Sequence, residues 1–169
     1  MLLGLLAILS LAVGAKSNMA AQEYHVTIPE EVHAIVQFKQ DELPGVAVVN
    51  SALVEFEPKV VFSWHFSMLI DAKDLGENGM PTPEEQQVLY DFEDTIDPVV
   101  KAQGNALFLA RVTHDGQRQL IYRVHSPEPL NDYLQGLIKS KNHQREFDYR
   151  IEPDGSWELA KWYLNAVSR

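Results

Sequence analysis

An α+β fold is predicted for this chain by the order of its local patterns, by its apolar content and by the absence of a linker. Between residues 59 and 152 the patterns indicate strand, helix, strand, strand, helix and strand. That order is typical of a ferredoxin-like sandwich, in which two helices cover one face of an antiparallel sheet. The 169 residues are 46% hydrophobic, which is enough for one core. We therefore expect residues 58–169 to form this βαββαβ sandwich with a short C-terminal helix, and residues 16–57 to add N-terminal strands to the same domain.

The first fifteen residues predict an export signal. They carry no charged side chain, and the apolar run is too short to span a bilayer comfortably. Cleavage is expected after Ala15, with Ala20 or Ala21 as alternative sites, so the signal extends at most to residue 21. We expect the protein in the periplasm or outside the cell, or held at the membrane by this segment if it is not cleaved, with no other membrane span.

The segment that follows contains short β-type runs separated by proline and glycine. The runs are 24–28, 34–38, 46–49 and 52–56. A longer run at 59–70 is aromatic and β-branched, which predicts a central strand.

A helix is then predicted from Thr82 onward. Thr82 is a suitable N-cap, Pro83 suits the first helical position, and Glu85 is spaced to close a capping box. Pro98 should kink or shorten the last turns. Apolar residues at helical spacing give one buried stripe, namely Val88, Leu89, Phe92, Ile96 and Val99.

A hairpin is predicted around Asp115 and Gly116, a pair that suits a two-residue type I′ turn. Regular pairing of 105–113 with 117–125 places Phe108 opposite Arg123. One face then carries Leu107, Leu109, Leu120, Tyr122 and Val124, with Arg111, Thr113 and Arg118 near the turn. The other face is too apolar to be left in water, so we expect the N-terminal strands or a second copy of the chain, in a homodimer, to cover Phe108, Ala110, Val112 and Ile121.

The remaining elements are a second helix, a last strand and a terminal helix. Ser126 and Pro127 begin the helix, alternation over 145–152 predicts the strand, and 157–167 the terminal helix. The stripe of the second helix is Leu130, Tyr133, Leu134, Leu137 and Ile138.

Composition excludes several classes of function. A net charge of −10 and a pI near 4.9 argue against a nucleic-acid surface. Because there is no cysteine, thiol catalysis, cysteine-ligated metals and disulfides are excluded. Glycine-rich phosphate loops, nucleophile elbows and paired-histidine zinc motifs are also missing from the sequence. The acidic residues are concentrated, since 71–97 contains nine of them and one lysine.

Two sets of residues remain as candidate binding sites, and each has a structural alternative. Arg111, Thr113, Arg118 and Tyr122 share a face, where two guanidinium groups and hydroxyls could hold an anion. Pairing of these arginines with acids of the helix at 84–97 is the favoured interpretation. His65 lies on the predicted central strand, where a structural role with a hydrogen-bonded partner is favoured over a role as a base.

Residues 74–85 partly match a calcium-binding loop. Position 3 is a glycine without a ligand and position 8 is a proline, and Glu85 is already accounted for by the capping box. A turn before a capped helix is therefore favoured, and no cofactor is predicted. If calcium binds, its ligands are Asp74, Asn78, Met80, Thr82 and Glu85.

The order of several short motifs resembles a bacterial family, the domain-of-unknown-function family 695, over about residues 58–164. The motifs are Asn78-Gly79-Met80-Pro81, a helix with Leu89 and Glu93, Arg111-x-Thr113-x-x-Gly116-x-Arg118 with Tyr122, and Asp154 with Trp157. Members are generally uncharacterised, and some are joined to a domain similar to regulators that inhibit ribonuclease E. The resemblance thus implies a role in interaction and supplies no catalytic residue.

Together these observations predict an exported, non-catalytic module that binds a protein or a small ligand through the acidic helix or the Arg111 end of the hairpin. The alternative is an enzyme for a small anionic substrate, with His65 as the base and Arg111 and Arg118 as the anion clamp. That alternative requires His65 and Arg111 to meet in one cleft.

Overall fold

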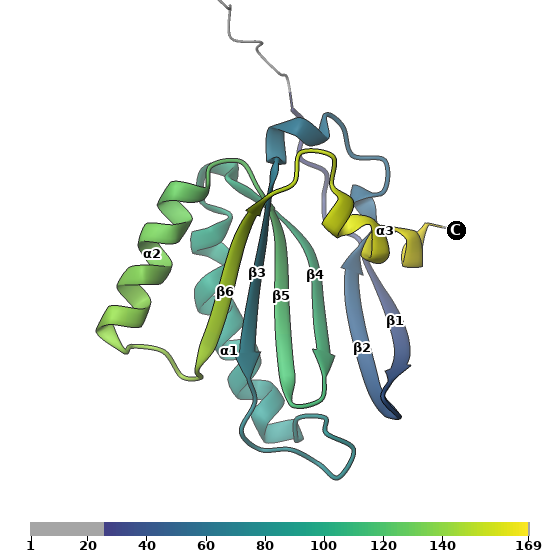
Figure 1. The fold of residues 1–169 in the computed structure, drawn as a ribbon, viewed down its shortest axis with the longest axis vertical. Helices are drawn as coiled ribbons and strands as arrows, with labels where there is room; N and C mark the ends of the chain where they lie inside the picture. Colours follow the sequence, from purple (N-terminus) through teal and green to yellow (C-terminus); the bar gives the residue numbers. More distant parts are fainter. Residues whose placement is uncertain (1–25, 169) are drawn as a thin grey trace, which may run out of the picture.

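The computed structural model describes residues 26–168 as a six-stranded antiparallel sheet with three α-helices (Figure 1). Across the sheet the strands follow the order β1-β2-β4-β5-β3-β6. They are β1 (His33–Gln40), β2 (Leu43–Asn50), β3 (Trp64–Asp71), β4 (Ala106–His114), β5 (Gln117–Val124) and β6 (Phe147–Pro153). The helices are α1 (Pro83–Val100), α2 (Pro127–Ser140) and α3 (Lys161–Val167). The predicted α+β class is confirmed, and the predicted export signal lies outside the described residues.

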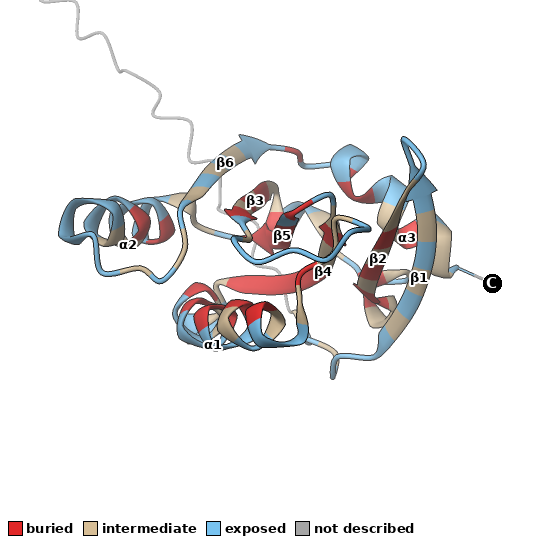
Figure 2. Cartoon of the chain, turned by 90° about the horizontal axis from the view of Figure 1, so that it is seen from below, coloured by how far each residue is buried: buried red, intermediate tan, exposed pale blue. Residues whose placement is uncertain are grey.

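Each face of the sheet has its own core, so the fold has three layers. On one face α1 and α2 cover a cluster that includes Phe66, Leu89 and Tyr122. On the other face α3 and short 3₁₀ turns cover a cluster that includes Leu53, Ile121 and Trp157. Figure 2 shows the two long helices and α3 on opposite sides of the strands. Burial on both faces explains why residues 106–110 of β4 and 120–122 of β5 are apolar without interruption.

Only one of the two hydrogen bonds of the predicted capping box forms at the start of α1. Thr82 Oγ1 accepts a hydrogen bond from the backbone N–H of Glu85 at 3.2 Å. The Glu85 carboxylate turns away from the cap and binds Arg145, which precedes β6. Pro98 lies inside the helix, which continues to Val100, so of the predicted kink or shortening the shortening does not occur. The sequence pattern located the helix but not the tertiary partner of Glu85.

The hairpin of β4 and β5 forms as predicted near its turn and differs toward its base. Asp115 and Gly116 have φ values of 43° and 73°, as a type I′ turn requires. A β-bulge between Phe108 and Ala110 then shifts the register, so Phe108 lies opposite Tyr122 and not Arg123. Alternation is broken there, and the predicted faces of Phe108, Leu107 and Leu109 are wrong. Leu109 is the additional residue, without a partner of its own in β5.

The region before β3 also departs from the predicted strands. Residues 26–28 are not in a strand, and the run at 52–56 begins with a 3₁₀ turn, Ser51–Leu53. A second 3₁₀ turn, Lys59–Phe62, occupies the first part of the expected central strand. These turns, with α3, cover the apolar face that we expected the N-terminal strands to cover, whereas β1 and β2 extend the sheet.

The β1–β2 end of the sheet is covered on one face only. α3 packs on it from one side, and Figure 2 shows none of the described helices on the side of α1 there. Register places Ile35 and Val48 side by side on this uncovered face, next to Arg111 of β4, which α1 covers. Ile35 is 72% exposed, an unusual value for an isoleucine in a strand.

Within residues 26–168, every helix is too short or too polar to cross a lipid bilayer.

Candidate functional site

Arg111 and Glu93 form a half-buried ion pair between β4 and α1. Arg111 Nη1 donates to both carboxylate oxygens of Glu93, at 3.0 and 3.1 Å. Burial raises the pKa of Glu93, although the neighbouring guanidinium opposes the rise. The favoured interpretation of the sequence, pairing of this arginine with the acidic helix, agrees with this geometry.

Arg118 lies deeper than Arg111 and has fewer partners. It is 2% exposed, and its Nε donates to Thr113 Oγ1 at 3.3 Å. Its guanidinium stacks on the ring of Tyr90, 4.5 Å from the centroid, and Arg111 stacks on the same ring at 4.8 Å. Arg118 Nη1 is buried without a hydrogen-bond partner among the described residues. Burial, reinforced by the charge of Arg111, lowers the pKa of Arg118.

Tyr122 belongs to the same face but binds farther along α1. Its hydroxyl donates to Asp97 Oδ1 at 2.9 Å. Burial and the Asp97 carboxylate raise the pKa of Tyr122 well above its ordinary value. The four residues predicted to share a face do so, and each of them already contacts other side chains of the protein.

His65 lies on the opposite face of the sheet, in a buried cluster with Arg123 and Asp154. Arg123 Nη1 donates to His65 Nδ1 at 3.1 Å and to Asp154 Oδ2 at 2.8 Å. Burial, followed by the charge of Arg123, lowers the pKa of His65 to about 4, so the ring is neutral at pH 7. The predicted structural role of His65 fits this environment. The alternative that joined His65 to Arg111 and Arg118 in one cleft is wrong, because the sheet separates them.

Asp154 also organises the turn that leads into α3. Burial alone would raise its pKa, but hydrogen bonds from Leu159 and Arg123 outweigh that effect and lower the pKa. Asp154 Oδ1 accepts the backbone N–H of Glu158 at 2.8 Å, and Oδ2 accepts that of Leu159 at 3.0 Å. Trp157 packs on Arg123, 4.9 Å from the guanidinium carbon to the ring. This cluster connects β3, β5 and the C-terminal segment.

The loop considered for calcium is held together by contacts within the chain. Arg145 binds both carboxylate oxygens of Glu85, at 2.7 and 2.6 Å, and these hydrogen bonds lower the pKa of Glu85. Thr82 donates to Asp74 Oδ2 at 3.0 Å. Asn78 Oδ1 accepts the N–H of Met80 at 3.1 Å, and the Met80 carbonyl accepts that of Gly76. Among residues 26–168 no cluster of three or more acidic or histidine side chains is arranged for a metal.

A groove lies between the C-terminal half of α1 and the start of β1. Its volume is about 160 Å³, and Val48 and Phe108 supply apolar surface. Lys101 bridges Glu31 and Asp97, at 2.6 and 2.8 Å, across the groove. Four acids therefore face two cations, and the groove has a net negative charge; its charged lining is Glu31, Glu93, Asp94, Asp97, Lys101 and Arg111.

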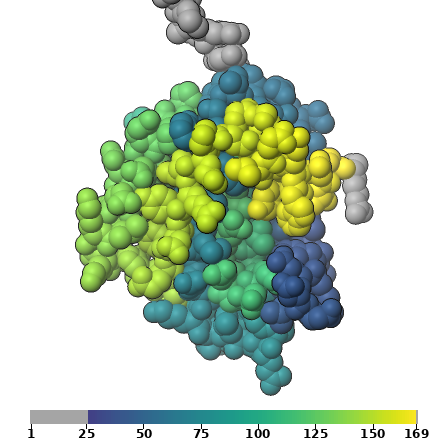
Figure 3. Space-filling view, viewed as in Figure 1, coloured from purple at the N-terminus to yellow at the C-terminus, as the bar shows by residue number. Residues whose placement is uncertain are grey.

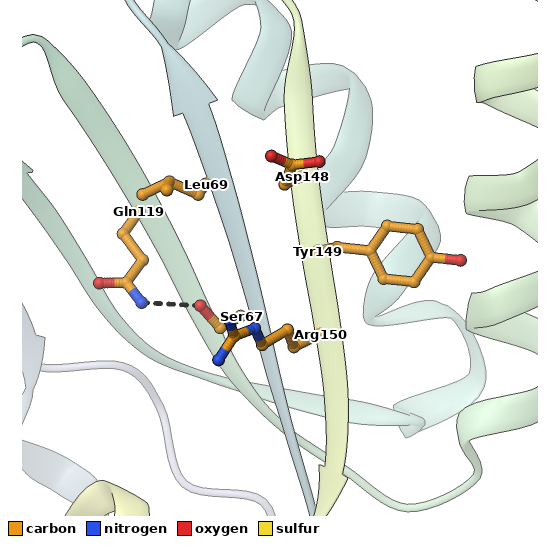
Figure 4. A pocket seen from close by; sticks show the side chains of 6 residues that line it. All are labelled: Ser67, Leu69, Gln119, Asp148, Tyr149 and Arg150. Atoms are coloured by element: carbon orange, nitrogen blue, oxygen red, sulfur yellow. Dashed lines mark hydrogen bonds between the residues drawn. The ribbon is translucent and has the colours of Figure 1, made fainter.

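A second hollow lies on the face that carries α3, over β5, β3 and β6 (Figure 4). Its volume is about 450 Å³, and Gln119 Nε2 donates to Ser67 Oγ across it at 2.7 Å. Asp148 and Arg150 line its β6 side, whereas the ring of Tyr149 points away toward α2. In Figure 3 the C-terminal segment covers only the upper part of this face. The lining of the hollow is about equally polar and apolar, and none of the predicted site residues lines it.

Comparison with protein families identifies the relationship that the motifs suggested. The model of DUF695, a family of unknown function, matches residues 35–165. The chain belongs to the DUF695 family. Comparisons with curated proteins and with solved structures return no match. In this DUF695 chain three of the hairpin motif residues contact α1, where Arg111 pairs with the motif residue Glu93, Arg118 stacks on Tyr90 and Tyr122 donates to Asp97. Thr113 accepts from Arg118, and the Asp154 carbonyl accepts the N–H of Trp157.

Sequence reasoning missed two features of this DUF695 chain. The partnership of His65 with Arg123 depends on the pairing of β3 with β5, which are not consecutive in the chain. Asp154 and Trp157, both part of the resemblance, were the available signal for that cluster. The groove beside α1 depends on β2 lying next to β4, a pairing that we could not order from the sequence.

Proposed function

We propose that this DUF695 protein is a non-catalytic binding module that takes a cationic segment of a partner protein in the groove beside α1. The observation that carries the proposal is the negative, partly apolar lining of that groove, next to a sheet face left without a helix. Asp94 is exposed at the groove, whereas Glu93 is committed to Arg111. A basic and apolar segment would match both parts of the surface.

The charged side chains that could serve catalysis support the same proposal. Three ion pairs hold the buried carboxylates, each between elements distant in the sequence: Glu93 with Arg111, Asp154 with Arg123, and Glu85 with Arg145. A base and an anion clamp would need groups free to face a substrate in one cleft. The geometry therefore favours binding over the enzyme alternative.

The test is affinity capture from the cell envelope fraction with three matched baits. They are the parent chain, Asp94→Lys in the groove, and Asp132→Lys, which makes the same change of charge on exposed α2. We expect a protein that the parent and Asp132→Lys retain and that Asp94→Lys loses. Equal retention by all three baits, or no specific protein on the parent, would overturn the proposal.

Export is part of the proposal and rests on the charge-free apolar residues 1–15. We expect the protein isolated from the envelope to begin at Lys16, or at residue 21 or 22 if an alternative site is used. Mass spectrometry of the intact protein measures this directly. A cytosolic protein that keeps Met1 would refute export.

We also infer that β3, α1, β4, β5, α2 and β6 form a ferredoxin-like sandwich. The order β6-β3-β5-β4, with both long helices on one face, supports this architecture. In that description β1 and β2 lengthen the sheet beyond β4 and create the uncovered face that borders the groove.

A further inference from the structure

The two edges of the sheet differ in how well they are protected against pairing with another strand. β6 carries the charged residues Asp148, Arg150 and Glu152 at its exposed positions and ends in proline. Charges and proline at such positions discourage strand addition. Along β1 the exposed positions are His33, Ile35, Gln37, Lys39 and Gln40, with a single lysine near one end. The β1 edge therefore lacks the protection that β6 has.

Apolar side chains flank the β1 edge on both faces. On the uncovered face, Ile35 is 72% exposed. On the other face Trp162 of α3 is 52% exposed and packs edge-on against Phe38, with ring centroids 5.9 Å apart. Val32, just before β1, is 57% exposed. Exposed apolar groups beside an unpaired strand edge indicate an interface.

The order of residues along β1 makes this edge complementary to itself. Glu31 and Lys39 each lie four residues from Ile35, on opposite sides. Antiparallel pairing of two copies about Ile35 places Lys39 of each opposite Glu31 of the other, where it would join the pairs that Glu31 already makes with Lys101 and His33. The same register brings Val32 of one copy opposite Phe38 of the other, beside Trp162. Charge and apolar surface are then matched twice, once on each side of the two-fold axis.

We propose that β1 pairs antiparallel with β1 of a second copy of this chain, centred on Ile35, so that two sheets become one of twelve strands. The uncovered faces of β1 and β2 from both copies would then form one continuous sheet surface between the two α1 helices. Asp94 lies on α1 and outside this edge, so the dimer can be tested separately from the proposed cationic partner. An Asp94→Lys protein should remain dimeric whatever its effect on capture.

The experiment measures the mass of the processed protein, purified from cells that make the full chain, by light scattering and sedimentation. We expect a dimer for the parent and for Ile138→Lys, an equivalent change at an exposed site on α2. Ile35→Lys should weaken association by about 100-fold, because two apolar contacts are lost per dimer. Circular dichroism checks that each variant is folded.

The register is tested with single cysteines, since the chain has no other. Ile35→Cys should form a disulfide-linked dimer on mild oxidation, because residues directly opposite in antiparallel strands lie within disulfide reach. Ile138→Cys should remain unlinked under the same conditions. A monomeric parent, with β1 then free for a strand of another protein, would overturn the proposal. So would a dimer that Ile35→Lys leaves intact.

Discussion

Replacing Asp154 by alanine should destabilise the protein strongly, because it leaves a buried cation without its counter-charge. Arg123 is fully buried, and Asp154 is its carboxylate partner at 2.8 Å. Removing one member of a buried ion pair costs roughly 3–5 kcal/mol. The change also removes the acceptors for the backbone N–H groups of Glu158 and Leu159, at about 1 kcal/mol each. The Asp154 carbonyl still accepts from Arg123, so we expect a loss of about 4 kcal/mol.

Urea unfolding at pH 7, followed by tryptophan fluorescence, measures this loss. In a thermal scan the melting temperature of Asp154→Ala should also fall by about 10 °C. Glu158→Ala is the control, because it removes an exposed carboxylate one turn away that pairs with Lys161 at the surface, and it should cost less than about 0.5 kcal/mol. Adding Arg123→Leu to Asp154→Ala should recover part of the loss, since no buried charge then remains. A loss below about 1 kcal/mol for Asp154→Ala would show that the cluster does not hold the C-terminal segment in place.

Three further outcomes follow from the other clusters. The pKa of His65 is about 4 in the folded protein and 6.5 in the unfolded chain, so stability should fall as the pH drops from 6.5 to 4. His65→Gln should reduce that fall by about 2 kcal/mol, as measured from urea midpoints, and identical pH profiles for the parent and the variant would contradict the assignment. Arg111→Met should lower the free energy of unfolding by about 2 kcal/mol because it leaves Glu93 unpaired, whereas Arg118→Met should lower it by less than about 1 kcal/mol. Thermal unfolding of both variants measures this, and the reverse order would contradict the pairing. Millimolar calcium should leave the melting temperature unchanged, because Arg145 occupies the carboxylate of Glu85; a rise that Glu85→Gln abolishes would establish a calcium site instead.

Features fixed by local chemistry were predictable from the sequence. The Asp115-Gly116 turn needs positive φ at two adjacent residues, and few dipeptides tolerate that, so its position was correct. The Thr82-Pro83 start of α1 was correct for a similar reason, since the cap and the first helical position select those residue types.

Features that depend on distant partners were not predictable. The bulge at Leu109 leaves no mark in the residue pattern, and it reversed the faces expected for the base of β4. Arg111 kept its predicted face because it lies between the bulge and the turn, where alternation counted from Asp115 still holds. Glu85 was expected to close its own cap, and Arg145, 60 residues away, binds it instead.

The β-bulge in β4 also determines which residues of this strand contribute to each of the two cores. Residues before Leu109 send odd-numbered side chains toward α3, and those after it send even-numbered side chains there. Deleting Leu109 would therefore restore regular alternation: Phe108 would stay opposite Tyr122 on the α1 face, and the core beneath α3 would lose one leucine. The bulge thus lets two consecutive residues, Leu109 and Ala110, both contribute to the core beneath α3, while Phe108 and Arg111 on either side of them face α1.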